Sequence, residues 1–497
     1  LSPFFAGFLN RAHGALALSI WLALPAAVTG QEEKEPSYPS LAAAADDLAA
    51  IPGMAPASYG ICLLELGETA TGVFSRFGNR SLIPASTVKL LTTGTALEVL
   101  GPDFSFETRL RTNGSIDQSS GTLKGDLLIE GSGDPLFARY GWKEIYEQWT
   151  RRLTENGIKT IDGAIVGDDT AFSSQHRPGS WAWADLGNYY GAGATGLNFN
   201  RNLFHIYFRS PGPGGPTRVI SRYPNQPEIQ LFNEVRAGAA GSGDQAYVYG
   251  ATFQKNLYLR GTVPPNQSKF SIKAAIPDPA LFAAQMLKKT LTGTGITHEG
   301  TAAAQGRTKT YPTATETLAS HRSGPLKELI LSTNHKSINL NAECLLKTIG
   351  RGKTDRPGSV ASGTRAVEDF MKSKGIPDRG LSLKDGSGLS RANLITPRQL
   401  AGFLKAMHNG THAEVFKRSL PVAGKTGTLK SIAGGSPAEG RIRGKSGTLS
   451  GIKCYAGYAR ARSGKTFAFA LMINHYDGSY APVKRGIVKV LVAMANL

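Results

Sequence analysis

Apolar and polar residues alternate in two different patterns along this chain. Long apolar runs lie in some stretches, and short apolar runs separated by turn residues lie in another. Residues 58–66 (SYGICLLEL) form a mostly apolar run that Gly67 and Glu68 end, which predicts a buried strand followed by a turn. After Pro84 the apolar residues fall on nearly every side of an expected helix, which predicts burial between layers. The apolar residues of this helix are Val88, Leu90, Leu91, Ala96, Leu97, Val99 and Leu100.

Between residues 104 and 307 the apolar runs become short and are separated by many Gly, Pro and Asn residues. Segments such as 125–131 (GDLLIEG) and 163–167 (GAIVG) are typical of strands bounded by turns, so this region is predicted to be rich in β-structure. Within it, a turn-rich stretch at about 210–273 is a candidate for a further, nested domain.

Helical patterns return after Pro325, at 340–349 and at 363–375. The chain then ends with two predicted strands and a helix, at 452–460, 466–474 and 483–496. The terminal helix lacks a strongly basic face, so packing on a sheet is favoured over a position on a membrane surface.

A chain of 497 residues is too long for one ordinary core. The motifs that could carry catalytic chemistry, described below, lie on both sides of the β-rich region. We therefore interpret that region as an insertion into one catalytic domain. The expected division is a signal peptide at 1–30, a first catalytic part at 31–103, an insertion at 104–315 and a second catalytic part at 316–497.

The first thirty residues have the pattern of a secretory signal. Arg11 precedes an apolar run over 14–28, after which come small residues and the polar stretch QEEKEP. The run is short for a membrane span and has no positive flank after it. Export to the periplasm is therefore expected, and an uncleaved N-terminal anchor is the alternative.

Charge and cysteine content narrow the class of protein. Lys and Arg exceed Asp and Glu by 56 to 37, a formal net charge of +19. Such a surface attracts cell-wall polymers, anionic lipids, acidic peptides or nucleic acid, and solubility alone is the plain alternative. The three cysteines each have apolar neighbours and lack the spacing of a metal site, which predicts buried thiols. They are Cys62, Cys344 and Cys454.

The segment Ser86-Thr87-Val88-Lys89 has the Ser-x-x-Lys spacing of an activated serine. A helix places residues three apart on one face, so Lys89 could take the proton of the Ser86 hydroxyl if burial lowers the pKa of the lysine. The spacing alone is weak evidence, because residues 450–453 match it within an expected strand.

Ser337-Ile338-Asn339 stands immediately before the helical stretch at 340–349. In one interpretation, Ser337 is the N-cap of this helix and has no role in catalysis. In the other, Ser337 relays a proton toward a leaving amine and Asn339 donates a hydrogen bond to a substrate carbonyl.

Two segments of the form Lys-[Thr/Ser]-Gly-Thr-Leu compete for the third role, at 425–429 and 445–449. Only the second is followed by a strand across a short turn, so we assign catalysis to Lys445. A peptide substrate could then add to the edge of this strand at Ser446, Gly447 and Thr448, with Lys445 holding its terminal carboxylate. The backbone N–H groups of Ser86 and Thr448 would form the oxyanion hole.

With the three motifs in this order, the chain resembles the low-molecular-mass class C penicillin-binding proteins, the D-alanyl-D-alanine carboxypeptidases and endopeptidases of peptidoglycan. The span of about 250 residues between Lys89 and Ser337 is typical of that group. Other stretches typical of it are 131–135 (GSGDP), 181–185 (WAWAD), 339–343 (NLNAE) and 385–391 (DGSGLSR). Many members of the group have Asp where this chain has Ile338. They often have Thr where this chain has Ser446, and both residues carry a hydroxyl.

The resemblance implies an α/β (α+β) fold: a serine β-lactamase/DD-peptidase-like catalytic domain with an antiparallel five-stranded sheet and helices, plus inserted β-rich domains. It implies acylation of Ser86 by peptidoglycan stem peptides, release of D-alanine, and covalent inhibition by β-lactam antibiotics. It also implies that Asp185, Tyr190 and Arg391 line a pocket for a diaminopimelate side chain. No metal, cofactor or nucleic acid is expected, whereas peripheral association with membrane or cell wall is compatible with the charge.

Two other functions share part of this pattern. A class A β-lactamase has the same motifs, but it is about half as long and needs a deacylating glutamate between the second and third motifs. A catalytically poor protein that binds murein or senses β-lactams would use the basic surface. It would have no need of the complete set of Ser86, Lys89, Ser337, Asn339 and Lys445.

Overall fold

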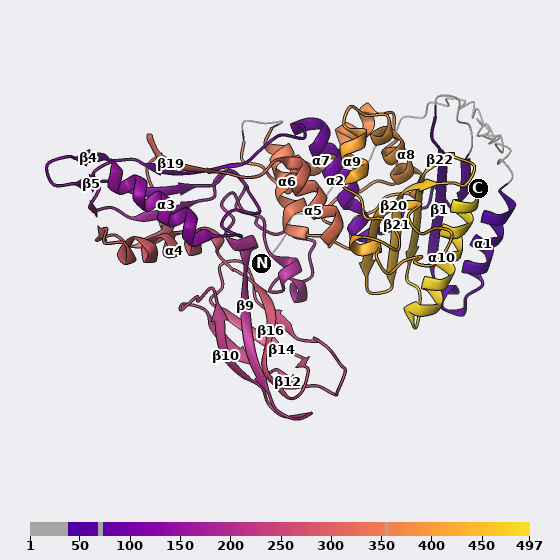
Figure 1. Ribbon diagram of the computed structural model, residues 1–497, viewed down its shortest axis with the longest axis horizontal. Helices are drawn as coiled ribbons and strands as arrows, with labels where there is room; N and C mark the ends of the chain where they lie inside the picture. Colours follow the sequence, from indigo (N-terminus) through magenta and orange to yellow (C-terminus); the bar gives the residue numbers. More distant parts are fainter. Residues whose placement is uncertain (1–37, 68–72, 353–355) are drawn as a thin grey trace, which may run out of the picture. The chain divides into compact units, whose positions relative to one another are not determined.

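The computed structural model describes residues 38–67, 73–352 and 356–497 (Figure 1). The predicted signal peptide at 1–30 lies outside these residues. Within the described ranges, no helix combines the length and the apolar character that crossing a membrane requires. All three cysteines are buried and free, as predicted.

The predicted antiparallel sheet is present and is built from both ends of the chain. Among the described residues its five strands lie in the order β2-β1-β22-β21-β20, and every neighbouring pair is antiparallel. The bounds are β1 (Ser58–Glu65), β2 (Val73–Arg76), β20 (Ile442–Leu449), β21 (Ile452–Arg460) and β22 (Thr466–Asn474). The strands predicted at 452–460 and 466–474 therefore have the expected limits.

Helices cover both faces of this sheet, and β22 shows why. Its odd-numbered residues from Phe467 to Ile473 belong to the core shared with α1 (Pro39–Ala49) and α10 (Tyr480–Asn496). Its even-numbered residues from Ala468 to Met472 belong to the core shared with α2 (Val88–Leu100) and α8 (Pro397–His408). Successive side chains of a strand point to opposite faces, so a strand that is apolar throughout is buried on both sides.

The terminal helix α10 begins three residues earlier than predicted. Its apolar residues pack against the sheet, as expected. Helix α2 is buried on nearly every side, as its apolar pattern predicted, because it contacts α5, α6, α7 and α8. The remaining bounds of this part are α5 (Leu326–Lys336), α6 (Asn339–Arg351), α7 (Val360–Ser373) and α9 (Ala413–Arg418).

Residues 107–322 form further sheets around a second large core. The largest has the order β18-β8-β6-β3-β19, and a smaller one has the order β17-β7-β5-β4. Their strands are β3 (Glu107–Thr112), β4 (Ser115–Asp117), β5 (Thr122–Lys124), β6 (Leu127–Glu130), β7 (Thr160–Ile161), β8 (Ile165–Asp168), β17 (Thr297–His298), β18 (Ala302–Ala304) and β19 (Glu316–Arg322).

Three short sheets occupy residues 203–275, with the orders β10-β9-β16, β11-β14-β13 and β12-β15. The strands are β9 (Leu203–Ser210), β10 (Arg218–Tyr223), β11 (Gln230–Asn233), β12 (Arg236–Ala237), β13 (Tyr247–Tyr249), β14 (Asn256–Arg260), β15 (Thr262–Val263) and β16 (Gln267–Ala275). The domain boundaries proposed at 103/104 and 315/316, and the nested domain at about 210–273, stay predictions.

Two helices of this region were missing from the β-rich prediction, α3 (Trp142–Glu155) and α4 (Pro279–Gly293). Helix α4 has a clear local start signal, since the Asp278 side chain accepts a hydrogen bond from the Leu281 N–H and Pro279 fills the first turn. The many glycines and prolines around it hid that signal.

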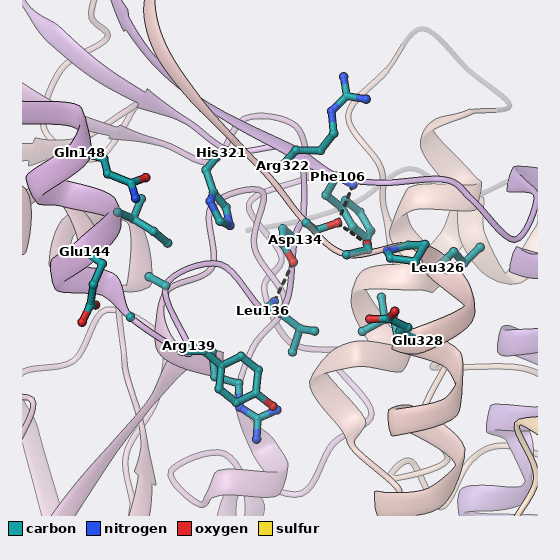
Figure 2. A pocket seen from close by; sticks show the side chains of 18 residues that line it. Phe106, Asp134, Leu136, Arg139, Glu144, Gln148, His321, Arg322, Leu326 and Glu328 are labelled. Atoms are coloured by element: carbon teal, nitrogen blue, oxygen red, sulfur yellow. Dashed lines mark hydrogen bonds between the residues drawn. The ribbon is translucent and has the colours of Figure 1, made fainter. Parts of the chain in front are cut away.

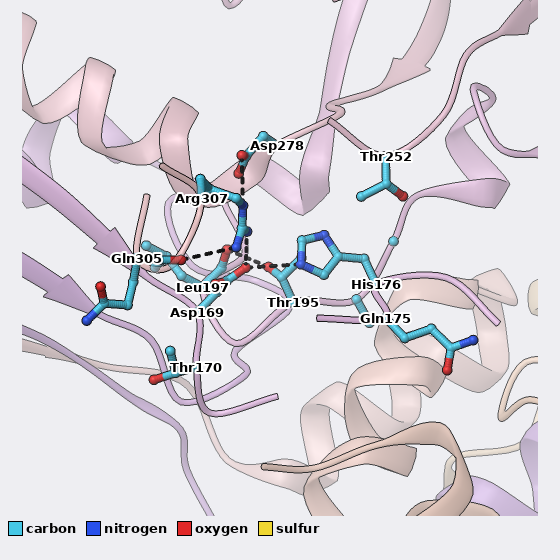
Figure 3. A network of polar contacts seen from close by, with 12 residues as sticks. Asp169, Thr170, Gln175, His176, Thr195, Leu197, Thr252, Asp278, Gln305 and Arg307 are labelled. Carbon is cyan, nitrogen blue, oxygen red and sulfur yellow. Dashed lines mark hydrogen bonds and ion pairs between the residues drawn. The ribbon is translucent and has the colours of Figure 1, made fainter. Parts of the chain in front are cut away.

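A buried polar network connects distant segments of the same region (Figure 3). Arg307 pairs with Asp169 at 2.7 Å and with Asp278 at 3.1 Å, and His176 lies 3.1 Å from the same Asp169 oxygen. The Arg307 guanidinium also lies over the ring of Phe253, 4.4 Å from its centroid. Paired in this way, the buried Asp169 carboxylate avoids much of the cost of burial.

Candidate active site

The turn that carries Ser86 is held between a helix and a strand. Ser86 lies in a 3-10 turn, η2 (Ala85–Thr87), and α2 continues directly from it. Strand β20 approaches this turn so closely that a Cβ on Gly447 would lie 2.6 Å from the Pro84 carbonyl oxygen and 3.0 Å from the Ser86 nitrogen. Glycine at 447 is therefore required by the approach of the strand to the nucleophile.

Lys89 is fully buried, and its amine lies at the centre of the first two motifs. Nζ is 3.0 Å from Ser86 Oγ, 2.7 Å from Asn339 Oδ1 and 2.5 Å from the Ser387 carbonyl oxygen. Burial lowers the pKa of Lys89 to about 7, and the carboxyl groups of Asp385 and Glu343 oppose this effect. An amine with this pKa is about half deprotonated at pH 7, and the deprotonated form can accept a proton.

The second motif joins two helices. Ser337 ends α5 with left-handed backbone angles (φ 55°, ψ 44°), and Asn339 is the first residue of α6. The helix-capping interpretation of Ser337 is wrong, because the residue that precedes α6 is Ile338 and no side chain caps this end. The Asn339 side-chain amide donates to the Tyr190 carbonyl oxygen at 2.8 Å, so one of its two N–H bonds is used within the protein.

The third motif lies on β20, which ends the sheet order. Lys445 is fully buried, with Nζ 2.7 Å from the Ser446 carbonyl oxygen. Burial, and then the nearby Lys89, lower its pKa well below the usual range for lysine. The competing Lys425 is exposed in a turn beside the 3-10 helix Gly427–Leu429, not on a strand.

The predicted side-chain pocket is assembled in part. Asp185 and Tyr190 lie in two short 3-10 turns, Trp183–Asp185 and Tyr189–Gly191, and the Tyr190 hydroxyl donates to Asp185 at 3.2 Å. Burial and Asp185 raise the pKa of Tyr190. Because the Tyr190 carbonyl accepts from Asn339, this pair adjoins the second motif. Arg391 is exposed and makes no hydrogen bond or ion pair with either residue within the described part of the chain.

Residues of two stretches without a predicted role also reach the site. Asp385 and Ser387 begin the DGSGLSR stretch, and Glu343 ends the NLNAE stretch. All three are buried, although carboxylates are rarely buried without a structural or chemical reason. Burial, followed by the charge of Asp385, raises the pKa of Glu343 to about 8. The stretches themselves were the available sequence signal, but nothing local indicated what these side chains contact.

A cavity of about 420 Å³ lies apart from the three motifs, between α3 and the start of α5 (Figure 2). Its lining combines the buried Asp134, which accepts from the Leu136 N–H, with charged residues of both signs such as Arg139 and Glu328. None of the predicted catalytic or substrate-binding residues lines it. The motifs, not this cavity, therefore define the candidate active site.

Comparison with known proteins agrees with the geometry. Residues 41–495 match the model of the D-Ala-D-Ala carboxypeptidase 3 (S13) family. The chain is 31% identical over 424 residues to the D-alanyl-D-alanine carboxypeptidase of Actinomadura sp. (strain R39), covering 83% of this chain and 77% of the relative. It is 29% identical over 406 residues to the D-alanyl-D-alanine carboxypeptidase DacB of Haemophilus influenzae, covering 80% and 82%.

The fold is likewise similar to a solved structure, the penicillin-binding protein 4 (dacB) of Haemophilus influenzae. The TM-score is 0.79 at 25% identity, over 92% of this chain and 99% of that chain. The resemblance to class C penicillin-binding proteins and the expected fold class are confirmed. Together these matches show that the chain belongs to the D-Ala-D-Ala carboxypeptidase 3 (S13) family of serine hydrolases.

Proposed function

We propose that this protein is a serine DD-peptidase that removes the terminal D-alanine from peptidoglycan stem peptides through an acyl-enzyme on Ser86. The observation that carries the proposal is the buried amine of Lys89, 3.0 Å from the Ser86 hydroxyl and held by Asn339. Membership of the family supports the same activity. It also disfavours a class A β-lactamase, because the match includes the large insertion.

In the first step, Ser86 Oγ attacks the carbonyl carbon of the bond between the two D-alanines. The hydroxyl proton passes to Lys89 Nζ, because burial lowers the pKa of this amine to about 7 and so leaves about half of it neutral and basic at pH 7. The negative charge that develops on the carbonyl oxygen is stabilised by the N–H groups of Ser86 and Thr448. The closeness of β20 to the Ser86 turn at Gly447 supports this pairing of donors.

In the second step, the C–N bond breaks and the leaving amine of D-alanine takes the proton that Lys89 accepted. Ser337 is the proposed relay for this proton, since it stands between α5 and α6 beside Asn339. Water then attacks the ester carbonyl and gives a proton to the neutral Lys89, which passes it to Ser86 Oγ as the ester bond breaks. The sum is hydrolysis of one amide bond without a cofactor.

Substrate is proposed to bind along the free edge of β20. Ser446, Gly447 and Thr448 would form backbone hydrogen bonds to the peptide as an added strand. Lys445 would hold the terminal carboxylate, since the negative charge of this ligand would offset the effects of burial and Lys89.

A diaminopimelate side chain is the proposed occupant of the region around Asp185, Tyr190 and Arg391. Its amine would face Asp185 and its carboxylate would face Arg391, which suits a zwitterion. The hydrogen bond from Tyr190 orients the Asp185 carboxylate, which supports Asp185 as the acidic end of this pocket. Hydrolysis of cross-links, which have the same D-alanyl bond, is proposed as a second use of the site.

β-Lactam antibiotics are proposed to acylate Ser86 covalently. A solved structure of the Haemophilus influenzae protein, at a similar fold, is a complex with a β-lactam. The periplasm is the proposed location, where stem peptides are accessible, and the net charge of +19 supports loose association with the cell wall or an anionic membrane surface.

The test is mass spectrometry of the intact protein and its peptides after incubation with benzylpenicillin, beside Ser86→Ala. We expect a stable adduct on Ser86 that the variant lacks, together with release of D-alanine from a D-Ala-D-Ala peptide by the wild type. Rapid drug hydrolysis without an adduct would instead indicate a β-lactamase. Absence of both adduct and hydrolysis would indicate a binding protein.

A further inference from the structure

The position of the Lys89 amine within the active site needs an explanation beyond the three motifs. A neutral lysine amine has two N–H bonds and one lone pair. Asn339 Oδ1 and the Ser387 carbonyl oxygen can only accept hydrogen bonds, and they lie 2.7 Å and 2.5 Å from Nζ. They therefore use both N–H bonds and leave the lone pair for the Ser86 hydroxyl at 3.0 Å.

The Ser387 carbonyl belongs to the peptide unit that joins Ser387 to Gly388. The N–H at the other side of that unit donates to Asp385 Oδ1 at 2.8 Å. One planar group thus connects the Asp385 carboxylate with the Lys89 amine. A shift of this carboxylate would turn the carbonyl that Lys89 donates to.

The preceding peptide units are fixed as well. The Gly386 N–H donates to Glu343 Oε1 at 3.0 Å, and the Gly386 carbonyl accepts from Thr92 Oγ1 at 2.7 Å. Thr92 lies three residues after Lys89, on the same buried helix. A side chain at 386 would collide with α6, since its Cβ would lie 2.9 Å from the Ala342 carbonyl oxygen.

Asp385 itself is held more firmly than a surface carboxylate. It is fully buried, and it also accepts hydrogen bonds from the Trp181 indole at 2.8 Å, the Ser390 N–H at 2.7 Å and the Asn393 amide at 2.7 Å. Gly388, in the same turn, has φ 81°, and a Cβ there would lie 1.9 Å from the Ala85 carbonyl oxygen. The turn is thus packed against the nucleophile.

The titratable groups that influence Lys89 come from three elements. Asp385 in this turn and Glu343 on α6 favour its protonated form. Lys445 on β20 is the neighbouring cation, and Lys89 lowers the pKa of Lys445. The two carboxyl groups oppose the stronger effect of burial, which by itself would lower the pKa of Lys89 below about 7. Removal of the charge at 385 would therefore lower that pKa further.

We propose that Asp385 is a positioning residue for the general base: through the Ser387–Gly388 peptide unit it orients the Lys89 amine so that the lone pair faces Ser86. This inference rests on the proposed roles of Ser86 and Lys89. It gives a function to the DGSGLSR stretch before Arg391 and to the Glu343 end of the NLNAE stretch. Both stretches meet at the Gly386 backbone.

The experiment measures the second-order rate of acylation by benzylpenicillin from pH 5 to pH 10, together with the melting temperature. For Asp385→Asn we expect the acylation rate to fall about 100-fold at the pH optimum. The acidic limb of the curve of rate against pH should shift to lower pH. Thr92→Val should lower the rate about tenfold without moving the limb, since it removes a hydrogen bond but no charge. Thr92→Ser, which keeps the hydroxyl, should restore the rate.

The matched control is Asp169→Asn, which alters a buried, hydrogen-bonded carboxylate outside the site. It should lower the melting temperature and leave the acylation rate and its pH profile as in the wild type. If Asp385→Asn behaves like this control, the inference is overturned. If Asp385→Asn does not fold, an unchanged rate in Thr92→Val overturns it instead.

Failure of the underlying function gives a different result. Acylation that persists in Ser86→Ala, or is absent in the wild type, would remove the proposed nucleophile and leave no base to position. Normal acylation at Ser86 in the wild type, combined with wild-type kinetics in both Asp385→Asn and Thr92→Val, would refute the positioning role alone.

Discussion

Two buried lysines belong to the candidate active site, and their different surroundings separate their proposed roles. Lys89 lies beside Asp385 and Glu343, which oppose the effect of burial on its pKa, whereas burial and then the nearby Lys89 both lower the pKa of Lys445. A substrate carboxylate would supply the negative charge that Lys445 lacks. Binding of substrate would then place a proton on Lys445 and, by repulsion, favour neutral Lys89.

Substitution Lys89→Ala is expected to lower acylation by at least about 1,000-fold, because the general base is lost, while the fold is retained. In the wild type the rate should rise with pH through about 7, as Lys89 loses its proton and becomes able to accept that of Ser86. Stopped-flow acylation over a pH series checks both. Lys425→Ala, in the exposed duplicate of the third motif, serves as the control and should retain full activity. Normal acylation of Lys89→Ala would exclude Lys89 as the base.

Arg391→Ala is expected to weaken turnover of diaminopimelate peptides about tenfold or more, and that of simple acyl-D-Ala-D-Ala far less. The exposed guanidinium can pair with the side-chain carboxylate of the first substrate, which the second does not have. The ratio of kcat/KM for the two substrates is the measurement. Equal losses on both would count against the side-chain pocket.

At the level of elements, the site depends on how closely β20 and the DGSGLSR turn approach the start of α2. Backbone contacts at Gly447 and Gly388 leave no room for a side chain against Pro84, Ala85 or Ser86. Elements packed this closely restrict the position of Ser86. The start of α2 and strand β20 would therefore hold the two N–H donors of the proposed oxyanion hole in place.

Gly447→Ala should accordingly lower the rate of acylation about 100-fold. The new Cβ would lie 3.0 Å from the Ser86 nitrogen and would push β20 away from it. Gly293→Ala is the matched control, because a Cβ there meets nothing within 4 Å. Its activity should equal that of the wild type. An active Gly447→Ala enzyme would mean that the approach of the strand is not critical.

At the level of the whole molecule, stability depends on buried polar links between segments far apart in sequence. Arg307 connects Asp169, next to the end of β8, with Asp278 at the start of α4 (Figure 3). Neither link touches the motif residues. Stability and catalysis should therefore respond separately to substitutions here.

Arg307→Met is expected to lower the free energy of unfolding by about 3 kcal/mol, because it removes the permanently charged partner of the buried Asp169 and leaves that carboxylate beside His176, whose pKa burial lowers. Denaturant titration measures this loss, and the acylation rate should remain unchanged. Arg260→Met breaks an exposed pair with Glu234 and should lower the free energy of unfolding far less, because water and salt screen such a pair. Equal losses in the two variants would contradict the importance of the buried network.

Features that depend on a local pattern of residues could be predicted from the amino-acid sequence alone. The apolar runs gave β21 and β22 with their observed limits, and the all-round apolar pattern after Pro84 gave the burial of α2. The order and spacing of three short motifs gave the family. These features are local because strand and helix periodicity, and the chemistry of a motif, are set by neighbouring residues.

The contacts between residues far apart in the sequence depend on how the helices and strands pack. Lys89 is 250 residues from Asn339 and 298 residues from Ser387, and no periodicity relates such positions. Asp385 and Glu343 were visible as members of characteristic stretches, yet their contact with the Gly386 turn depends on how α2 and α6 pack together. The left-handed Ser337 likewise follows from the junction of α5 and α6, since packing can impose a backbone conformation that the residue itself disfavours.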